Sequence, residues 1–120
     1  MSRSRAGKAS GDPFAALIAL SGAIAVIAGA YGAHGATGKA AQWLNTGAHY
    51  QMVHAAAALV ILARSRGAAA LMLAGAALFA GTLYAMALGG PKWLGAVTPL
   101  GGLGMILGWM WAATVYLRGR

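Results

Sequence analysis

Charged residues divide the chain into four long apolar windows. Between Asp12 and Lys39, Lys39 and Arg64, Arg66 and Lys92, and Lys92 and Arg118 lie 26, 24, 25 and 25 uncharged residues. Each window exceeds the roughly 20 residues that an α-helix needs to cross about 30 Å of hydrocarbon. The spacing therefore predicts an all-α bundle of four transmembrane helices, near Pro13–Tyr31, Ala41–Ala63, Gly67–Leu88 and Pro99–Leu117.

The composition agrees with a membrane protein. Of the 120 residues, 60% are hydrophobic and 8% are charged, whereas an ordinary soluble domain has roughly 25% charged residues. We expect one transmembrane domain at residues 13–117, between a basic tail at 1–12 and a short tail at 118–120. The basic start and the first apolar run also resemble a signal peptide, but its removal would leave an odd number of spans.

The distribution of basic residues predicts the orientation of the helices. The net charge of +8 is not arranged as a face interleaved with aromatic residues, so we expect contact with anionic lipid and no nucleic acid. Lys39 and Lys92 fall on one side, and seven of the nine basic residues fall on the other: Arg3, Arg5, Lys8, Arg64, Arg66, Arg118 and Arg120. The positive-inside rule then places both termini in the cytoplasm, with external turns around 35–40 and 89–98.

Local patterns predict helix starts and helix contacts. Asp12 before Pro13 and Thr98 before Pro99 are typical of an N-cap followed by a first-turn proline. Most tryptophans and tyrosines, Trp109 and Tyr84 among them, are expected in an interfacial belt. Small residues at helical spacing predict close packing, either within one chain or between copies: Ser21, Ala25, Gly29, Ala77, Gly81, Gly104, Gly108 and Ala112.

The second predicted helix carries a polar and aromatic stripe. At about 100° per residue, its members fall within roughly 140° of one another: Trp43, Thr46, Gly47, Tyr50, Gln51 and His54. His54 would lie near the middle of the membrane, where an ionisable residue needs a partner or a wet cavity. His49 points elsewhere, and His34 is expected in an external turn.

Several interpretations of this stripe remain open. His54 can be a neutral residue that joins helices through Tyr50, Gln51 or a neighbouring hydroxyl. Alternatively, a lipid, a quinone or another amphiphile could bind in a pocket lined by Trp43, Tyr50, Gln51 and His54, with His34 and His49 as further candidates. Haem would require histidines facing an open cavity, and a metal site made of the three histidines would have no carboxylate or thiol ligand. We therefore predict no cofactor and no metal site.

Four ordered segments resemble a known family. They are GAYGAHG at 29–35, YQMVHAAAALVI at 50–61, GTLYAMALGG at 81–90 and TPLGGLGMILGW at 98–109. Together they resemble the small membrane proteins of domain of unknown function family 423, which are related to eukaryotic transmembrane protein 256. The family often has phenylalanine in place of Tyr31 and an aromatic residue in place of Val53. The resemblance implies a multi-pass protein of a bacterial inner membrane and transfers no catalytic residue.

The residues show no catalytic constellation. No serine, cysteine or carboxylate is suitably placed beside a histidine for nucleophilic work, and the sole acid, Asp12, is expected as a helix cap. We predict a non-enzymatic structural or accessory subunit of a larger membrane complex, or of an assembly of its own copies. Binding of an amphiphile is the alternative function, and a haem or metal protein is a third.

Overall fold

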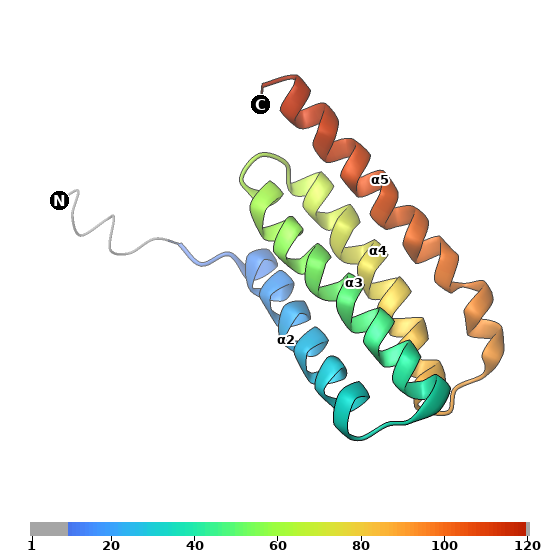
Figure 1. The fold of residues 1–120 in the computed structure, drawn as a ribbon. Helices are drawn as coiled ribbons and strands as arrows, with labels where there is room; N and C mark the ends of the chain where they lie inside the picture. Colours follow the sequence, from blue (N-terminus) through green and yellow to red (C-terminus); the bar gives the residue numbers. More distant parts are fainter. Residues whose placement is uncertain (1–9, 120) are drawn as a thin grey trace.

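Four long α-helices account for most of the chain. The structure, a computed structural model, describes residues 10–119. These residues form α2 (Pro13–His34), α3 (Gly38–Leu62), α4 (Arg66–Ala87), the 3-10 helix η1 (Lys92–Ala96) and α5 (Thr98–Leu117) (Figure 1). The four predicted helices are confirmed, with ends that differ by at most three residues. The basic tail at 1–9 and Arg120 lie outside the described residues.

Side chains cap the starts of α2 and α4 but not those of α3 and α5. The Asp12 carboxylate accepts from the backbone amides of Phe14 (3.1 Å) and Ala15 (3.2 Å), which confirms its role as an N-cap. The Ser65 hydroxyl caps α4 by accepting from the Ala68 amide (3.1 Å). The prediction that Thr98 caps the last helix is wrong, because η1 leads directly into α5 and Val97 is its N-cap.

The helices form a flattened layer. The main interfaces join α2 to α3, α3 to α4 and α4 to α5, and Figure 1 shows α2 and α5 at the two edges. The Cα atoms extend 31 Å across the layer and 18 Å through it, whereas four helices packed in a square would have a nearly equal cross-section. Much of α2 and α5 therefore remains exposed.

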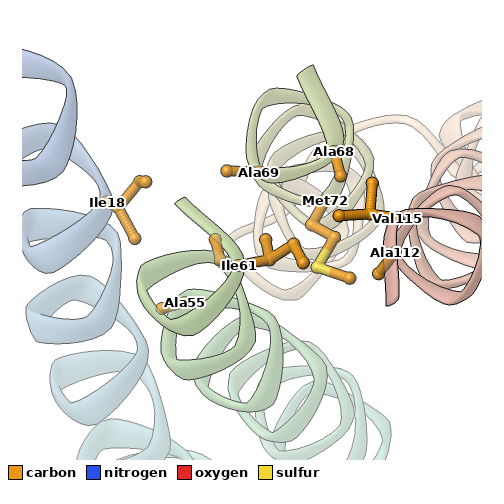
Figure 2. Close-up of a cluster of buried hydrophobic side chains, with 9 residues drawn as sticks. Ile18, Ala55, Ile61, Ala68, Ala69, Met72, Ala112 and Val115 are labelled. Atoms are coloured by element: carbon orange, nitrogen blue, oxygen red, sulfur yellow. The ribbon is translucent and has the colours of Figure 1, made fainter. Parts of the chain in front are cut away.

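The larger hydrophobic cluster joins all four helices near the α3–α4 turn. Figure 2 shows Met72 of α4 pointing between α3 and α5, with Ile61 on one side and Val115 on the other. Most other members are alanines, so the helix backbones approach one another closely. A second cluster of Ala28, Leu44 and Ala48 packs near the opposite end of α2 and α3.

Glycines make the contact between α4 and α5 possible. A Cβ atom added to Gly75 would lie 2.6 Å from the Met105 backbone nitrogen, and one added to Gly101 would lie 2.7 Å from the Gly75 carbonyl oxygen. The predicted packing residues of α5 also face α4. Gly104 lies against Gly75, Gly108 lies against Met72, and Ala112 belongs to the cluster around Met72. Glycine is needed wherever backbones pass this closely.

The other predicted packing residues divide into two groups. Ser21 and Ala25 are buried, and a Cβ atom added to Gly29 would lie 3.4 Å from the Ala48 side chain, so this part of α2 faces α3. Ala77 and Gly81 of α4 are exposed, and an added Cβ at Gly81 would meet no atom within 4 Å. This face of α4 is not covered by the described part of the chain.

Among residues 10–119, three stretches are long and apolar enough to cross a membrane: α2, α4 and the segment Lys92–Leu117 that contains α5. The α3 helix has 25 residues but is less apolar than the others, because the polar stripe lies on it.

Candidate functional site

His54 joins α3 to α5. Its Nε2 atom accepts a hydrogen bond from the Trp109 indole N–H (2.8 Å), and its Nδ1 atom lies 2.7 Å from the Tyr50 carbonyl oxygen. An indole N–H can only donate, so Nε2 carries no proton and Nδ1 must donate to the carbonyl. This pattern fits the neutral imidazole. His54 is buried, with 4% of its surface exposed. Trp109 lies in the middle of α5 and bonds another helix, and its placement at a membrane interface stays a prediction.

Gln51 and two threonines make further contacts between helices. The Tyr84 hydroxyl of α4 donates to Gln51 Oε1 of α3 (2.7 Å). Tyr84 thus lies near the end of α4, where an interfacial residue is expected, and also bonds a side chain of another helix. The Thr82 and Thr98 hydroxyls lie 2.6 Å apart and join α4 to α5. Hydrogen bonds of this kind stabilise helix association in an apolar medium.

The predicted stripe does not line one pocket, because α4 packs against its centre. Gln51 lies in a groove of about 340 Å³ between α2 and α4, called the α2–α4 groove, which is also lined by Leu17, Leu20, Ser21, Ile24, Ala70, Leu73, Ala74 and Ala77. Tyr50 and His54 lie in a groove of about 330 Å³ between α3 and α5, the α3–α5 groove, with Phe79, Gly102, Met105, Ile106 and Trp109.

The two grooves open on opposite sides of α4. Ala77 lines the first and Phe79 lines the second, and two residues along an α-helix correspond to a rotation of about 200°. Phe79, Met105 and Trp109 were not among the predicted site residues. Their aromatic or apolar character was visible in the sequence, but their place beside His54 depends on which helices pair.

The remaining candidate residues lie apart from both grooves. His49 lines a separate depression between α2 and α3 with Asn45 and Met52, and Trp43 is partly buried near the start of α3. His34 is the exposed last residue of α2 rather than part of a turn. Within residues 10–119, no three histidine or acidic side chains are grouped so that they could hold a metal ion.

Charged side chains gather where α2 and α4 begin. The Arg66 guanidinium donates to both Asp12 carboxylate oxygens, at 3.0 and 3.2 Å, and the Arg64 guanidinium lies 4.9 Å from the centre of the Tyr116 ring. Two hydrogen bonds lower the pKa of Asp12 below its ordinary value. The bond from Arg66 has the larger effect, and the bond from the Ala15 amide has the next. These contacts bring α2, α3, α4 and α5 together at one end of the layer.

Long apolar helices, a core of alanine and glycine, and internally bonded polar groups define a multi-pass helical membrane protein. Comparison with known proteins agrees. Residues 28–102 match the family described as "Protein of unknown function (DUF423)". The chain belongs to this family, whose curated relatives are named UPF0382 membrane proteins.

The relatives come from bacteria and a fungus. The UPF0382 membrane protein YwdK of Bacillus subtilis is 38% identical over 120 residues, covering 87% of this chain and 98% of the relative. The UPF0382 membrane protein of Haemophilus influenzae is 35% identical, covering 82% and 89%. The UPF0382 membrane protein C1782.12c of Schizosaccharomyces pombe is 35% identical, covering 76% and 90%. No solved structure shows a significant match.

Proposed function

We propose that the chain crosses the bilayer of a bacterial inner membrane four times, with both termini in the cytoplasm. The α3 helix runs between α2 and α4 (Figure 1), so it accompanies them across the bilayer, and its 25 residues span about 37 Å. Its polar groups Gln51 and His54 are hydrogen-bonded within the protein. These bonds reduce the cost of placing a less apolar helix in hydrocarbon.

Charge supports this orientation. Arg64, Arg66 and Arg118 adjoin one end of the helices, and Lys39 and Lys92 adjoin the other. The positive-inside rule places the arginine end in the cytoplasm.

The orientation can be tested on intact cells with an impermeant amine reagent and a C-terminal tag. We expect Lys39 and Lys92 to react, while the tag becomes accessible only after permeabilisation. Accessible tags on intact cells, together with unreactive Lys39 and Lys92, would contradict this orientation.

We further propose that the protein is a non-catalytic accessory subunit whose α2–α4 groove receives a transmembrane helix of another membrane protein. The observation that carries this proposal is Gln51 in the α2–α4 groove. Its Oε1 atom accepts from Tyr84, but its amide N–H groups donate to no atom of residues 10–119 and open into the groove. A donor that faces hydrocarbon without an acceptor is costly.

The shape of this groove suits a helix. Ala70, Ala74 and Ala77 form one wall, and Gly81 continues the same face of α4, where an added Cβ atom would meet nothing within 4 Å. Small side chains let a second helix backbone approach closely, and a carbonyl or hydroxyl on that helix can accept from Gln51. The proposed role requires no resident haem or metal, so the purified protein should be colourless and free of stoichiometric metal.

Site-specific cross-linking in native membranes tests the accessory role. The chain has no cysteine, so Ala74→Cys introduces a single thiol in the groove. We expect a cross-link of defined size to one partner protein, and we expect Ala77→Leu in the same chain to abolish it. Ala113→Leu, on the exposed side of α5, is the matched control and should leave the cross-link intact.

Two outcomes would overturn the accessory role. A cross-link that survives Ala77→Leu unchanged would show that the α2–α4 groove is not the contact surface. A cross-linked product with the mass of two copies of this chain would show self-association in place of a heterologous partner.

The alternative function, binding of an amphiphile, is favoured by a different observation. The α3–α5 groove has aromatic walls and also contains a polar group, the Tyr50 hydroxyl, that has no hydrogen-bond partner among residues 10–119.

A further inference from the structure

Tyr50 places a hydroxyl group halfway along α3. It is the central residue of the helix Gly38–Leu62, roughly 18 Å from either end at 1.5 Å per residue. Its ring packs against Phe79, with 4.9 Å between ring centres, and lies beside the His54 ring at 6.3 Å. The side chain is 42% exposed and lines the α3–α5 groove.

The Tyr50 hydroxyl differs from the other polar groups around it. It makes no hydrogen bond to any of residues 10–119, whereas both His54 nitrogens and the Trp109 indole N–H are paired. In a bilayer no water is available at this depth, and an unpaired hydroxyl in hydrocarbon is costly relative to water. The four-crossing arrangement proposed above therefore leaves Tyr50 in need of an acceptor from outside residues 10–119.

The lining of the groove limits what that acceptor can belong to. Tyr50, Phe79, Trp109 and His54 present rings, and Met105 adds a polarizable thioether that contacts aromatic groups favourably. Gly102 leaves room for a flat group, because a Cβ there would find only the Phe79 ring edge, at 3.9 Å. The volume of about 330 Å³ is at the lower end of the range of small-molecule sites.

The charge of the groove excludes some amphiphiles. None of its lining residues is a lysine, an arginine or an acid, and the hydrogen bonds of His54 fit its neutral form. A fatty-acid carboxylate or a phospholipid headgroup would lose its hydration without gaining an ionic partner. An uncharged ring that bears a carbonyl oxygen loses little hydration, and its oxygen can accept a hydrogen bond from the Tyr50 hydroxyl.

We propose that the α3–α5 groove binds the planar, carbonyl-bearing ring of an uncharged membrane amphiphile of the quinone type, with the Tyr50 hydroxyl donating to a ring carbonyl. The ring stacks among Tyr50, Phe79 and Trp109, and the apolar tail lies along the exposed side of α5 towards the lipid. His54 is a positioning residue, because its bond to the indole N–H fixes the orientation of Trp109 at the edge of the groove.

Binding can be measured with decyl-benzoquinone in lipid nanodiscs that contain the full chain. Quinones quench tryptophan fluorescence, and Trp109 lines the groove. Wild-type protein should show saturable quenching. The variant Tyr50→Phe removes only the hydroxyl and should weaken binding about three- to tenfold, the effect of one hydrogen bond. Tyr31→Phe removes an exposed hydroxyl at the end of α2 and should bind like the wild type.

Two further measurements separate a specific site from partition into lipid. Gly102→Leu fills the groove with a flexible side chain and should abolish saturable quenching, and decylbenzene, which has the tail but no carbonyl, should not compete with the quinone. Equal quinone affinity in wild-type and Tyr50→Phe proteins, or effective competition by decylbenzene, would overturn the proposal.

Failure of the membrane placement would give a different result. In a Tyr50→Cys variant in native membranes, rapid reaction with a water-soluble maleimide would show that Tyr50 is not in hydrocarbon, which would contradict the four-crossing arrangement. A protected thiol combined with absent quinone binding would reject the ligand and leave the arrangement intact. The cross-link at Ala74 reports on the other groove and is independent of quinone binding.

Discussion

The glycine contact between α4 and α5 gives the sharpest test of how the helices are held together. In Gly101→Ala, the new methyl group would lie 2.7 Å from the Gly75 carbonyl oxygen and 2.8 Å from the Phe79 Cα atom. Both are backbone atoms, so no side-chain rotation can relieve the overlap. Ordinary contact between heavy atoms is about 3.5–4.0 Å, and α5 must therefore move away from α4 by about 1 Å.

The cost follows from that displacement. A gap of 0.5–1 Å forfeits about a quarter to a half of the dispersion energy of each affected contact, and overpacking of this kind typically costs about 1–3 kcal/mol. The movement also separates the Thr82 and Thr98 hydroxyls, which lie 2.6 Å apart. We expect Gly101→Ala to lose about 2–3 kcal/mol of stability, although alanine is intrinsically the better helix former.

The measurement is unfolding in mixed micelles with increasing sodium dodecyl sulfate, followed by circular dichroism and tryptophan fluorescence. Gly102→Ala is the matched control, because its methyl group would meet only the Phe79 side chain, at 3.9 Å. The control should unfold at or above the wild-type midpoint. A Gly101→Ala protein as stable as Gly102→Ala would refute the inference that backbone contact at Gly101 sets the distance between α4 and α5.

Two smaller effects are expected elsewhere. Trp109→Phe leaves His54 Nε2 without its donor, and we expect it to cost about 0.6–1.7 kcal/mol, the range of hydrogen bonds between membrane helices, in the same unfolding assay. Trp93→Phe, at a residue 66% exposed, should be neutral, and equal midpoints for the two variants would contradict a structural role of the His54–Trp109 bond. Because Arg66 lowers the pKa of Asp12, this carboxylate contributes stability above its ordinary pKa, and the contribution is lost as the pH falls through the lowered value. The pair is exposed and its effect is small, so Asp12→Asn should be slightly less stable than wild type at neutral pH and equal to it in strong acid, and a difference that persists in acid would contradict this linkage.

The sequence predicted the helices well because their ends have strong local causes. The charges at Lys39, Arg64 and Lys92 mark the connections, and the carboxylate of Asp12 caps α2 as its place before proline indicated. The Thr98 hydroxyl was misread because the 3-10 helix before it supplies the helical turn. Thr98 instead bonds the Leu94 carbonyl and Thr82.

The contacts between helices were harder to predict. In α4, small residues occur on every side, so the sequence contains two equivalent faces, one with Gly75 and one with Gly81. Only the path of α5 decides between them, and it covers Gly75. The polar stripe of α3 posed a similar problem, because its breadth of about 140° is wide enough for α4 to divide it between two grooves.

The succession of neighbouring contacts along the layer has a consequence for biogenesis. Since α2 packs on α3, α3 on α4 and α4 on α5, each helix finds its main partner immediately before it in the order of synthesis. The first hairpin can thus assemble in the lipid while the ribosome is still translating the second, and apolar contacts of short sequence separation form fast. The hydrogen bond between Trp109 of α5 and His54 of α3 passes over α4 in the order of synthesis. It can therefore form only after the last helix has been made and has packed against the others.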